Sequence, residues 1–264
     1  MSQDREEILG RGPVLREAEH WRLFRTATAA ARLGAQTAVL AVSRRGVRLF
    51  AADDPAAPAW WISTTIRWPS ATAGRALIAP PAAIAGALEL AGRPRGRYGT
   101  SVYFEDCVVH FSGLGGTAAV RGRTVPFGAG ESAVPIGDDE ELVLDGDYTI
   151  AEVALPYLEF MSAVRAAGPA VELRLAEEPA GAFSRWRFEV AGGGFTRRLL
   201  AEVRAPPERA PVVGRYQARI MRELLIPTYG TLTLEFTEPE SSPALRARWA
   251  DYHRSTEFFV APLS

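Results

Sequence analysis

Hydrophobic and polar positions recur along this chain with periods that change several times. Four segments carry apolar residues at the three- and four-residue spacing of an amphipathic helix. They predict helices at Glu19–Leu33, Pro80–Ala91, Leu155–Ala167 and Arg215–Ile226. Between them, runs rich in β-branched and aromatic residues predict strands. These runs are Thr37–Phe50, Trp60–Trp68, Ser101–Phe111, Val171–Leu175, Trp186–Val190, Thr231–Phe236 and Glu257–Val260.

The order of these elements is the same in the two halves of the chain. Each half offers a strand, a helix, a β-rich stretch, a second helix and a final set of strands, although the halves share little residue identity. Internal self-similarity of this kind dictates architecture. We therefore predict a leader at 1–12, a first domain at 13–123, a connector at 124–147 and a second domain at 148–264. The connector mixes Gly and Pro with an acidic cluster, which is typical of an exposed crossing between domains.

Composition narrows the class of protein without identifying it. Apolar content of 47% and charged content of 23% in 264 residues are ordinary for a folded globular protein. No apolar run reaches the roughly 20 residues that a membrane-spanning helix needs. The segment Met1–Gly10 lacks the basic and apolar order of a signal peptide. A single cysteine, Cys107, cannot form an internal disulfide and fits a reducing compartment. We expect a soluble, cytoplasmic protein with no membrane partner.

All 30 basic residues are arginine, and the net charge is −1. A GC-rich genome explains an arginine-only chain, and so does a preference for phosphate or carboxylate groups, which the planar guanidinium binds in a bidentate way. Any contact with nucleic acid must come from local placement of charge, because the molecule is not basic overall.

The residues that enzymes use most often are sparse or poorly placed. None of the three histidines lies at metal-ligand spacing from another histidine or from Cys107. The chain has no nucleophile-elbow sequence and no phosphate-binding loop, and without lysine it cannot form a Schiff base. Paired carboxylates at Asp53–Asp54 and Glu177–Glu178 fall in predicted turns. We expect no enzymatic activity, no metal and no cofactor; an enzyme with an unrecognised acidic site is the alternative.

Arginines gather on the predicted helices. On the first helix they fall within about 80° of one another at 100° per residue, and on the fourth they follow the i, i+4, i+7 spacing of one stripe. Such stripes suit either a solvated face or a surface that follows DNA phosphates without reading bases. The candidate DNA-binding residues are Arg22, Arg25, Arg32, Arg165, Arg215, Arg219 and Arg222.

The end of the chain resembles the closing segment of the DNA sliding clamps, the family of the bacterial clamps and of proliferating cell nuclear antigen. The resemblance lies in the helix Tyr216–Leu225, the strand Gly230–Phe236, the turn Thr237–Leu245 and the terminal run Phe258–Leu263 with its Ala-Pro-Leu triplet. In the first half, Phe24–Leu33 followed by Thr37–Val42, Gly46–Ala52 and the Asp53 turn is similar to the family's helix and hairpin. Ala76–Gly92 resembles the second helix of a clamp domain.

The resemblance implies an α+β fold with two similar clamp-like, or processivity-fold, domains. The β-sheets would form the outside and four helices would cover one inner face. Clamp rings contain about six such domains, so two per chain imply a homotrimer. The implied function is a sliding clamp, or a clamp homologue, that encircles double-stranded DNA without sequence preference and tethers a DNA polymerase or other DNA-processing partner in replication or repair. The implied location is the nucleoid-associated cytoplasm.

The resemblance also implies a pocket for partner peptides between the connector and the C-terminal strand. Its residues would be Val134, Pro135, Ile136, Pro227, Ala261, Pro262 and Leu263. Ordinary packing of a loop and a strand is the alternative explanation for these residues.

Three features depart from the family: the second helix is nearly uncharged, lysine is absent, and the charged stretch Arg246–Arg254 is long for a hairpin. These departures leave two alternatives open: a specialised clamp homologue, and a clamp-fold interaction scaffold or regulator that does not encircle DNA.

Overall fold

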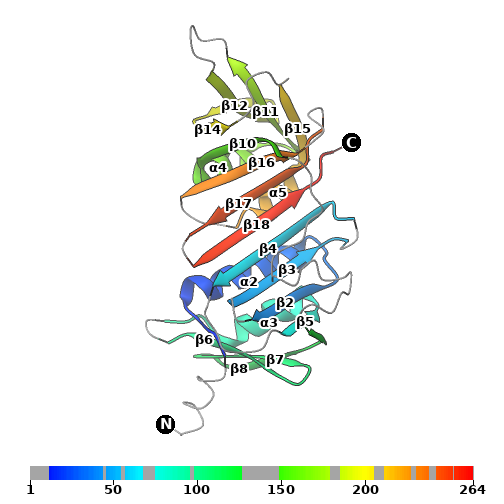
Figure 1. Cartoon of the computed structure of the whole chain (residues 1–264), viewed down its shortest axis with the longest axis vertical. Coiled ribbons are helices and arrows are strands. Elements are labelled where there is room, and N and C mark those ends of the chain that lie inside the picture. The colour runs from blue at the N-terminus through cyan, green and yellow to red at the C-terminus, as the bar shows by residue number, and fades with distance from the viewer. Residues whose placement is uncertain are drawn as a thin grey trace. The chain divides into compact units, whose positions relative to one another are not determined.

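The structure is a computed structural model that describes residues 12–43, 46–54, 57–67, 75–95, 98–126, 149–178, 185–204, 211–226, 230–237, 242–251 and 253–263. The chain divides into two compact units (Figure 1). The first comprises Met1–Pro58, Ile62–Leu144 and Ala250–Thr256, and the second comprises Ala59–Trp61, Asp145–Trp249 and Glu257–Ser264. The predicted leader, residues 1–12, and the predicted connector, residues 124–147, lie almost entirely outside the described residues.

The first unit contains two helices and two sets of strands. The helices are α2 (Glu17–Arg32) and α3 (Pro81–Ala91). A four-stranded sheet has the order β1-β6-β7-β8, and a second set has the order β4-β3-β2-β5-β9. The strands are β1 (Val14–Leu15), β2 (Ala38–Ser43), β3 (Gly46–Ala52), β4 (Trp60–Arg67), β5 (Arg75–Ala79), β6 (Thr100–Glu105), β7 (Val108–Gly113), β8 (Gly116–Arg121) and β9 (Arg123–Pro126).

The second unit repeats this composition with shorter helices, α4 (Tyr157–Ala166) and α5 (Ala218–Leu224). Its four-stranded sheet has the order β13-β12-β11-β15, and its other strands follow the order β14-β10-β16-β17-β18. The strands are β10 (Thr149–Pro156), β11 (Ala170–Glu178), β12 (Arg185–Gly192), β13 (Phe195–Leu199), β14 (Glu202–Arg204), β15 (Val212–Gln217), β16 (Thr231–Thr237), β17 (Leu245–Ala250) and β18 (Arg254–Val260).

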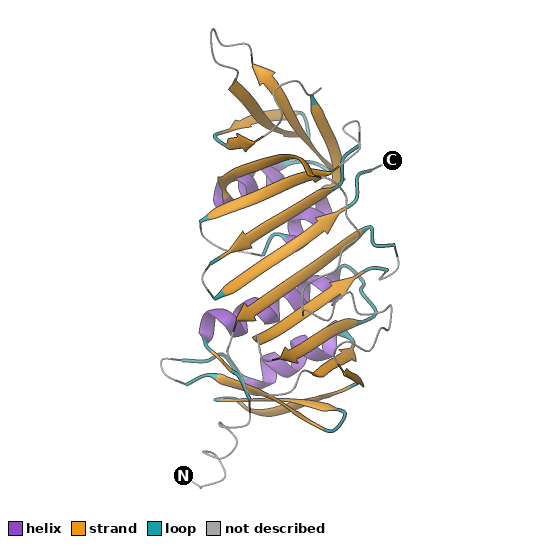
Figure 2. Ribbon diagram, viewed as in Figure 1, coloured by secondary structure: helices purple, strands orange, loops and turns teal. Residues whose placement is uncertain are grey.

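Both units follow the chain order strand, helix, strands, helix, strands, which confirms the predicted repeat. In each unit the two helices lie on the same face of the strands (Figure 2). The fold is therefore α+β, with two similar units and four helices among the described residues, as the sequence predicts. No helix in the described part of the chain is long and apolar enough to cross a membrane.

Local sequence explains where the helices begin and end. The backbone N–H of Arg16 donates to Glu19 Oε2 at 2.6 Å, which satisfies a donor at the start of α2 in the manner of a capping box. Pro81 occupies the first turn of α3, where its missing N–H costs nothing, and the helix ends at Gly92. The helices predicted at Glu19–Leu33, Pro80–Ala91 and Leu155–Ala167 agree with the observed ones to within two residues at each end.

Each unit has its own apolar core. In the first, Leu23, Leu49, Ile62 and Leu88 are fully buried between helices and strands. In the second, the rings of Phe160, Phe188 and Phe236 form a chain, with centroid separations of 6.4 and 6.5 Å. Aromatic pairs at these distances add to the stabilisation that burial alone provides.

Some predicted elements differ in extent from the observed ones. The helix predicted at Arg215–Ile226 begins only at Ala218, because residues 212–217 pair with β11 as strand β15. The run Ser101–Phe111 is a hairpin, β6 and β7, with Cys107 in the turn after Asp106 (φ +50°). Of the charged stretch Arg246–Arg254, residues 246–250 belong to strand β17 and Arg254 begins strand β18.

Candidate nucleic-acid and partner surfaces

Helix α2 presents its three predicted DNA-binding arginines in different environments. Arg22 is only 6% exposed, and its Nη1 donates to Thr256 Oγ1 at 3.1 Å. Arg25 is half-buried, and its guanidinium lies 4.6 Å from the centre of the Trp21 ring, a cation–π contact. Arg32 is exposed in the last turn. Arg22 is therefore an internal residue and does not reach solvent as the stripe predicts, whereas Arg25 and Arg32 lie at the surface.

Arg22 belongs to a buried polar network inside the first unit. Thr64 Oγ1 lies 2.7 Å from Thr26 Oγ1 and 3.0 Å from Thr256 Oγ1, and the Thr26 hydroxyl also donates to the Arg22 carbonyl at 2.9 Å. All of these side chains are buried. A buried charge is stable only when it is hydrogen-bonded, so the threonines explain how the core tolerates a guanidinium.

In the second unit, Arg222 binds the carbonyl groups at the end of helix α4. Its guanidinium donates to three carbonyls at the end of α4: Val164 at 3.4 Å, Gly168 at 2.6 Å and Ala167 at a shorter distance. The last carbonyls of a helix have no partner within the helix, and a cation there also opposes the negative end of the helix dipole. Arg222 thus caps α4, and its donors are turned towards the protein.

The predicted arginines of this unit, Arg222 included, are exposed, but they do not form a helical stripe. Arg219 lies on α5 and Arg165 lies in the last turn of α4, whereas Arg215 lies on strand β15 opposite Glu172. The i, i+4, i+7 spacing places side chains on one face only within a continuous helix, and Arg215 lies outside helix α5. Arg165 and Arg219 remain candidates for contacts with phosphate on the helical face.

Only the C-terminal part of the predicted peptide pocket lies within the described residues. Val134, Pro135, Ile136 and Pro227 lie outside them. Residues 261–263 are half-buried and extended: Ala261 N–H donates to the Ala59 carbonyl at 2.8 Å, and Leu263 N–H donates to the Arg215 carbonyl at 2.7 Å. The segment Ala261–Leu263 is therefore held in place by its backbone, with side chains still accessible.

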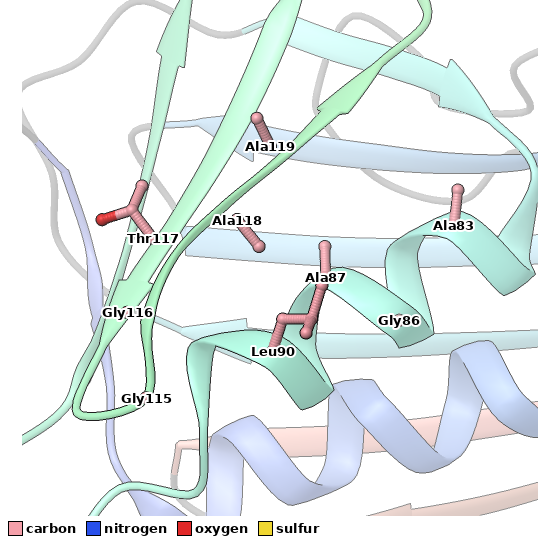
Figure 3. A pocket seen from close by; sticks show the side chains of 9 residues that line it. All are labelled: Ala83, Gly86, Ala87, Leu90, Gly115, Gly116, Thr117, Ala118 and Ala119. Carbon is pink, nitrogen blue, oxygen red and sulfur yellow. The ribbon is translucent and has the colours of Figure 1, made fainter.

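A shallow groove of about 430 Å³ lies between α3 and the first half of β8 (Figure 3). It is lined by Ala83, Gly86, Ala87 and Leu90 of α3 and by residues 115–119 of β8 and the turn before it. Small side chains on both walls leave the space open. Strand β8 is the last strand in the order of its sheet, so the groove borders a sheet edge.

Exposed leucines gather next to the two terminal strands β8 and β13. Among the described residues, five large apolar side chains are exposed, and four of them are leucines. Leu90 (70% exposed) lines the groove, and Leu114 lies in the turn between β7 and β8. Leu200 (84% exposed) follows β13, and Leu158 lies on α4, which packs against β12 and β13. Exposed apolar side chains beside an unpaired strand edge are characteristic of a protein–protein contact.

Two titratable side chains of the first unit, His20 and Asp251, have pKa values that their surroundings displace. Burial, assisted by the Arg93 charge, lowers the pKa of His20 from 6.5 to about 4, and His20 Nδ1 lies 2.8 Å from Thr100 Oγ1. Burial favours a higher pKa for Asp251, but hydrogen bonds from the Arg254 side chain and from the backbone N–H groups of His253 and Arg254 outweigh it and lower the pKa. The described residues contain no group of three or more potential metal ligands.

Comparison with known proteins supports the fold. No protein-family model matches the chain, and no curated protein matches its sequence. Among solved structures, the chain is similar to one titled "C-terminal region of FEN-1 bound to A. fulgidus PCNA", where PCNA is proliferating cell nuclear antigen. The two share 14% identity and a TM-score of 0.64, over 95% of this chain and 98% of that one. The chain therefore has the fold of a PCNA-type clamp over nearly its whole length.

Proposed function

We propose that this protein is a DNA sliding clamp, or a clamp homologue, that closes into a ring around duplex DNA and tethers a polymerase or other DNA-processing partners. The observation that carries the proposal is the agreement of fold with A. fulgidus PCNA over 95% of the chain. In this mechanism topology retains the DNA, and tethering raises the effective concentration of the partner at its substrate. No bond is made or broken, so the protein acts as a scaffold and not as an enzyme.

Ring closure requires a head-to-tail contact between subunits, and the exposed leucines support one. The groove and edge strand β8 belong to the first unit, and edge strand β13 with Leu200 belongs to the second. Two different patches on one chain produce a heterologous contact, which gives a closed ring when the rotation between subunits closes. Two clamp-like units per chain and six per ring give a homotrimer.

The test of assembly is solution mass by light scattering over a concentration series. We expect a mass close to three times 28.6 kDa. Leu200→Glu places a charge in the proposed contact and should shift the mass towards the monomer, whereas Gln36→Glu, at another exposed site in the first unit, should leave it unchanged. A wild-type protein that stays monomeric at all concentrations contradicts the ring.

Encirclement has its own test, retention on closed circular DNA followed by linearisation. A ring stays on a circle in high salt and leaves when a restriction enzyme cuts the DNA, because free ends let it slide off. Equal retention on circular and linear DNA indicates ordinary electrostatic binding instead. Replacing Arg25, Arg165 and Arg219 by alanine should weaken low-salt association with duplex DNA, with Arg204→Ala on β14 as the control.

Peptide-mediated tethering is the second part of the proposal. The similar PCNA structure holds the C-terminal region of FEN-1, and the accessible segment Ala261–Leu263 is the described part of the corresponding pocket in our proposal. Titration of the chain with that FEN-1 peptide should give binding that a scrambled peptide lacks and that Leu263→Asp removes. Equal signals from both peptides contradict a peptide pocket of this type.

The second candidate function is a clamp-fold interaction scaffold that does not encircle DNA. The burial of Arg22 and the capping role of Arg222 favour it, because the first guanidinium is withdrawn from solvent and the donors of the second are engaged with carbonyls at the end of α4. If the protein is such a scaffold, we expect a monomer or dimer that is retained equally on circular and on linear DNA.

A further inference from the structure

The terminal strands β8 and β13 each follow a turn that rests on the end of a helix. In the first unit, Gly115 N–H, just before β8, donates to the Ala91 carbonyl at the end of α3 at 2.9 Å. In the second unit, a Cβ on Gly193, just before β13, would lie 3.5 Å from the Ala166 carbonyl oxygen at the end of α4. The start of each terminal strand therefore lies beside the C-terminal end of a helix.

Each of these strands then runs back along its helix. In the first unit, the groove between them is lined by α3 from Ala83 to Leu90 and by residues 115–119 (Figure 3). In the second unit, Arg197 Nη1 lies 3.5 Å from Ser162 Oγ, so the middle of β13 lies beside the middle of α4. The ten residues of α4 and the five of β13 span roughly the same length, about 15 Å. The end of β13 therefore lies near the first turn of α4.

The four exposed leucines lie at opposite ends of the two terminal strands. Leu90 is in the last turn of α3 and Leu114 is in the turn before β8, so both lie at the start of β8; we name them the start pair. Leu158 is in the first turn of α4 and Leu200 directly follows β13, so both lie at the end of β13; we name them the end pair. Their exposed fractions range from 50% for Leu114 to 84% for Leu200.

This placement distinguishes between the two directions in which β8 and β13 of different copies can pair. Antiparallel strands place the start of one beside the end of the other, so the start pair of one copy meets the end pair of the next. Parallel strands would hold the two pairs at opposite ends of the contact. The described neighbours of β8 and β13 within their own sheets, β7 and β12, also pair with them in the antiparallel direction.

The groove beside the start pair can receive an apolar side chain from a second copy. The nine residues that line it carry no charge, and their small side chains leave about 430 Å³ open. Covering such a groove with leucine removes apolar surface from water without desolvating a charge. The chain itself carries both complementary parts, the groove with the start pair in the first unit and the end pair in the second, which identifies the occupant as a second copy.

We propose that two copies of this chain associate through an antiparallel contact between β8 of one and β13 of the other, and that the leucines of the start and end pairs cluster at one end of it. A few central residues carry most of the binding energy of a typical interface, and these four leucines have that role here. The inference rests on the proposed ring for the association of copies. It deepens that proposal by fixing the direction of the contact and the residues that hold it together.

The direction is tested by cross-linking full-length chains with a short bismaleimide. The background is Cys107→Ser, because the natural cysteine is exposed. Leu90→Cys and Leu158→Cys are made in separate copies and mixed at a concentration at which the wild type is assembled. We expect a cross-linked dimer that neither variant gives alone. The control mixture replaces Leu158→Cys by Ala166→Cys, at the exposed far end of α4, and should give none.

Two other cross-linking results overturn the inference. A product from Leu90→Cys with Ala166→Cys, and none with Leu158→Cys, indicates a parallel contact. A product from Leu90→Cys alone indicates that the same surface of both copies meets in a two-fold contact.

The energetic role of the leucines is tested by sedimentation over a concentration series. Leu158→Ser should raise the dissociation constant of self-association by about tenfold or more. The matched control is Tyr98→Ser, because both side chains are 51% exposed and Tyr98 precedes Gly99, which packs against β1 at the other end of the strand order from β8. Circular dichroism of each variant checks that the fold is intact.

An unchanged dissociation constant for Leu158→Ser, or a wild type that stays monomeric, overturns the leucine contact. Retention on closed circular DNA tests encirclement separately. Retention that Leu158→Ser does not alter overturns only the leucine contact, whereas cross-linking between Leu90→Cys and Leu158→Cys without retention overturns only the ring around DNA.

Discussion

Acidification should destabilise this protein through one buried histidine. His20 is 4% exposed on α2, and burial, with a smaller contribution from the Arg93 charge, lowers its pKa from 6.5 to about 4. A lower pKa in the folded state means that the unfolded chain takes up the proton first. The free energy of unfolding is therefore highest above pH 6.5 and falls as the pH drops towards 4.

The magnitude follows from the size of the pKa difference. Each unit corresponds to about 1.4 kcal/mol, so the whole displacement is worth roughly 3 kcal/mol. Between pH 6.5 and 5, before most carboxylates begin to titrate, the loss should be about 2 kcal/mol. This is a large part of the stability of an ordinary domain, which is about 5–15 kcal/mol.

Urea unfolding at pH 7, 6, 5.5 and 5, at one protein concentration, measures this loss. The matched variant is His20→Gln, whose amide can still hydrogen-bond to Thr100 but does not titrate. The variant should show a pH dependence shallower by about one proton over this range, whatever its stability at pH 7. Parallel pH profiles for the wild type and His20→Gln would refute the reasoning, because the folded state would then protonate as readily as the unfolded chain.

Other predictions concern stability. Arg222→Ala should destabilise the second unit by about 1–3 kcal/mol because it leaves the carbonyls at the end of α4 without donors, and thermal unfolding should show little change for the nearby surface variant Arg165→Ala. Thr64→Val should cost about 1–3 kcal/mol by removing the central hydroxyl of the Thr26–Thr64–Thr256 network; an unchanged urea midpoint would contradict the network's role. Gly92→Ala should lower the melting temperature, since it combines a positive φ with backbone contact, and equal melting temperatures would count against that contact.

The type of fold could be predicted because the spacing of apolar residues within each segment indicates a helix or a strand. The order of these segments then indicates the repeat. Helices α2, α3 and α4 lie where the pattern places them. The predicted start of the fourth helix at Arg215 was wrong, because strand β15 is followed directly by helix α5 and the apolar pattern does not mark the boundary between them. Residues 212–217 form a strand because they pair with β11. Propensity cannot reveal such a boundary, since the partner strand lies some 40 residues away.

The candidate surface was harder to predict, because helical spacing gives the direction of a side chain but not what covers it. Arg22 and Arg25 are close on the helix wheel, yet one is buried against Thr256, more than 200 residues away, and the other lies over Trp21. Arg222 faces the end of a neighbouring helix for the same reason.

The assignment of residues 250–256 to the first unit has a consequence for synthesis of the chain. Arg22 is made more than 200 residues before Thr256, whose hydroxyl accepts its hydrogen bond. Residues 250–256 follow nearly the whole of the second unit along the chain, so this hydrogen bond of the first unit cannot form until residues 145–249 have been made. The two units of this protein therefore cannot complete their packing strictly one after the other.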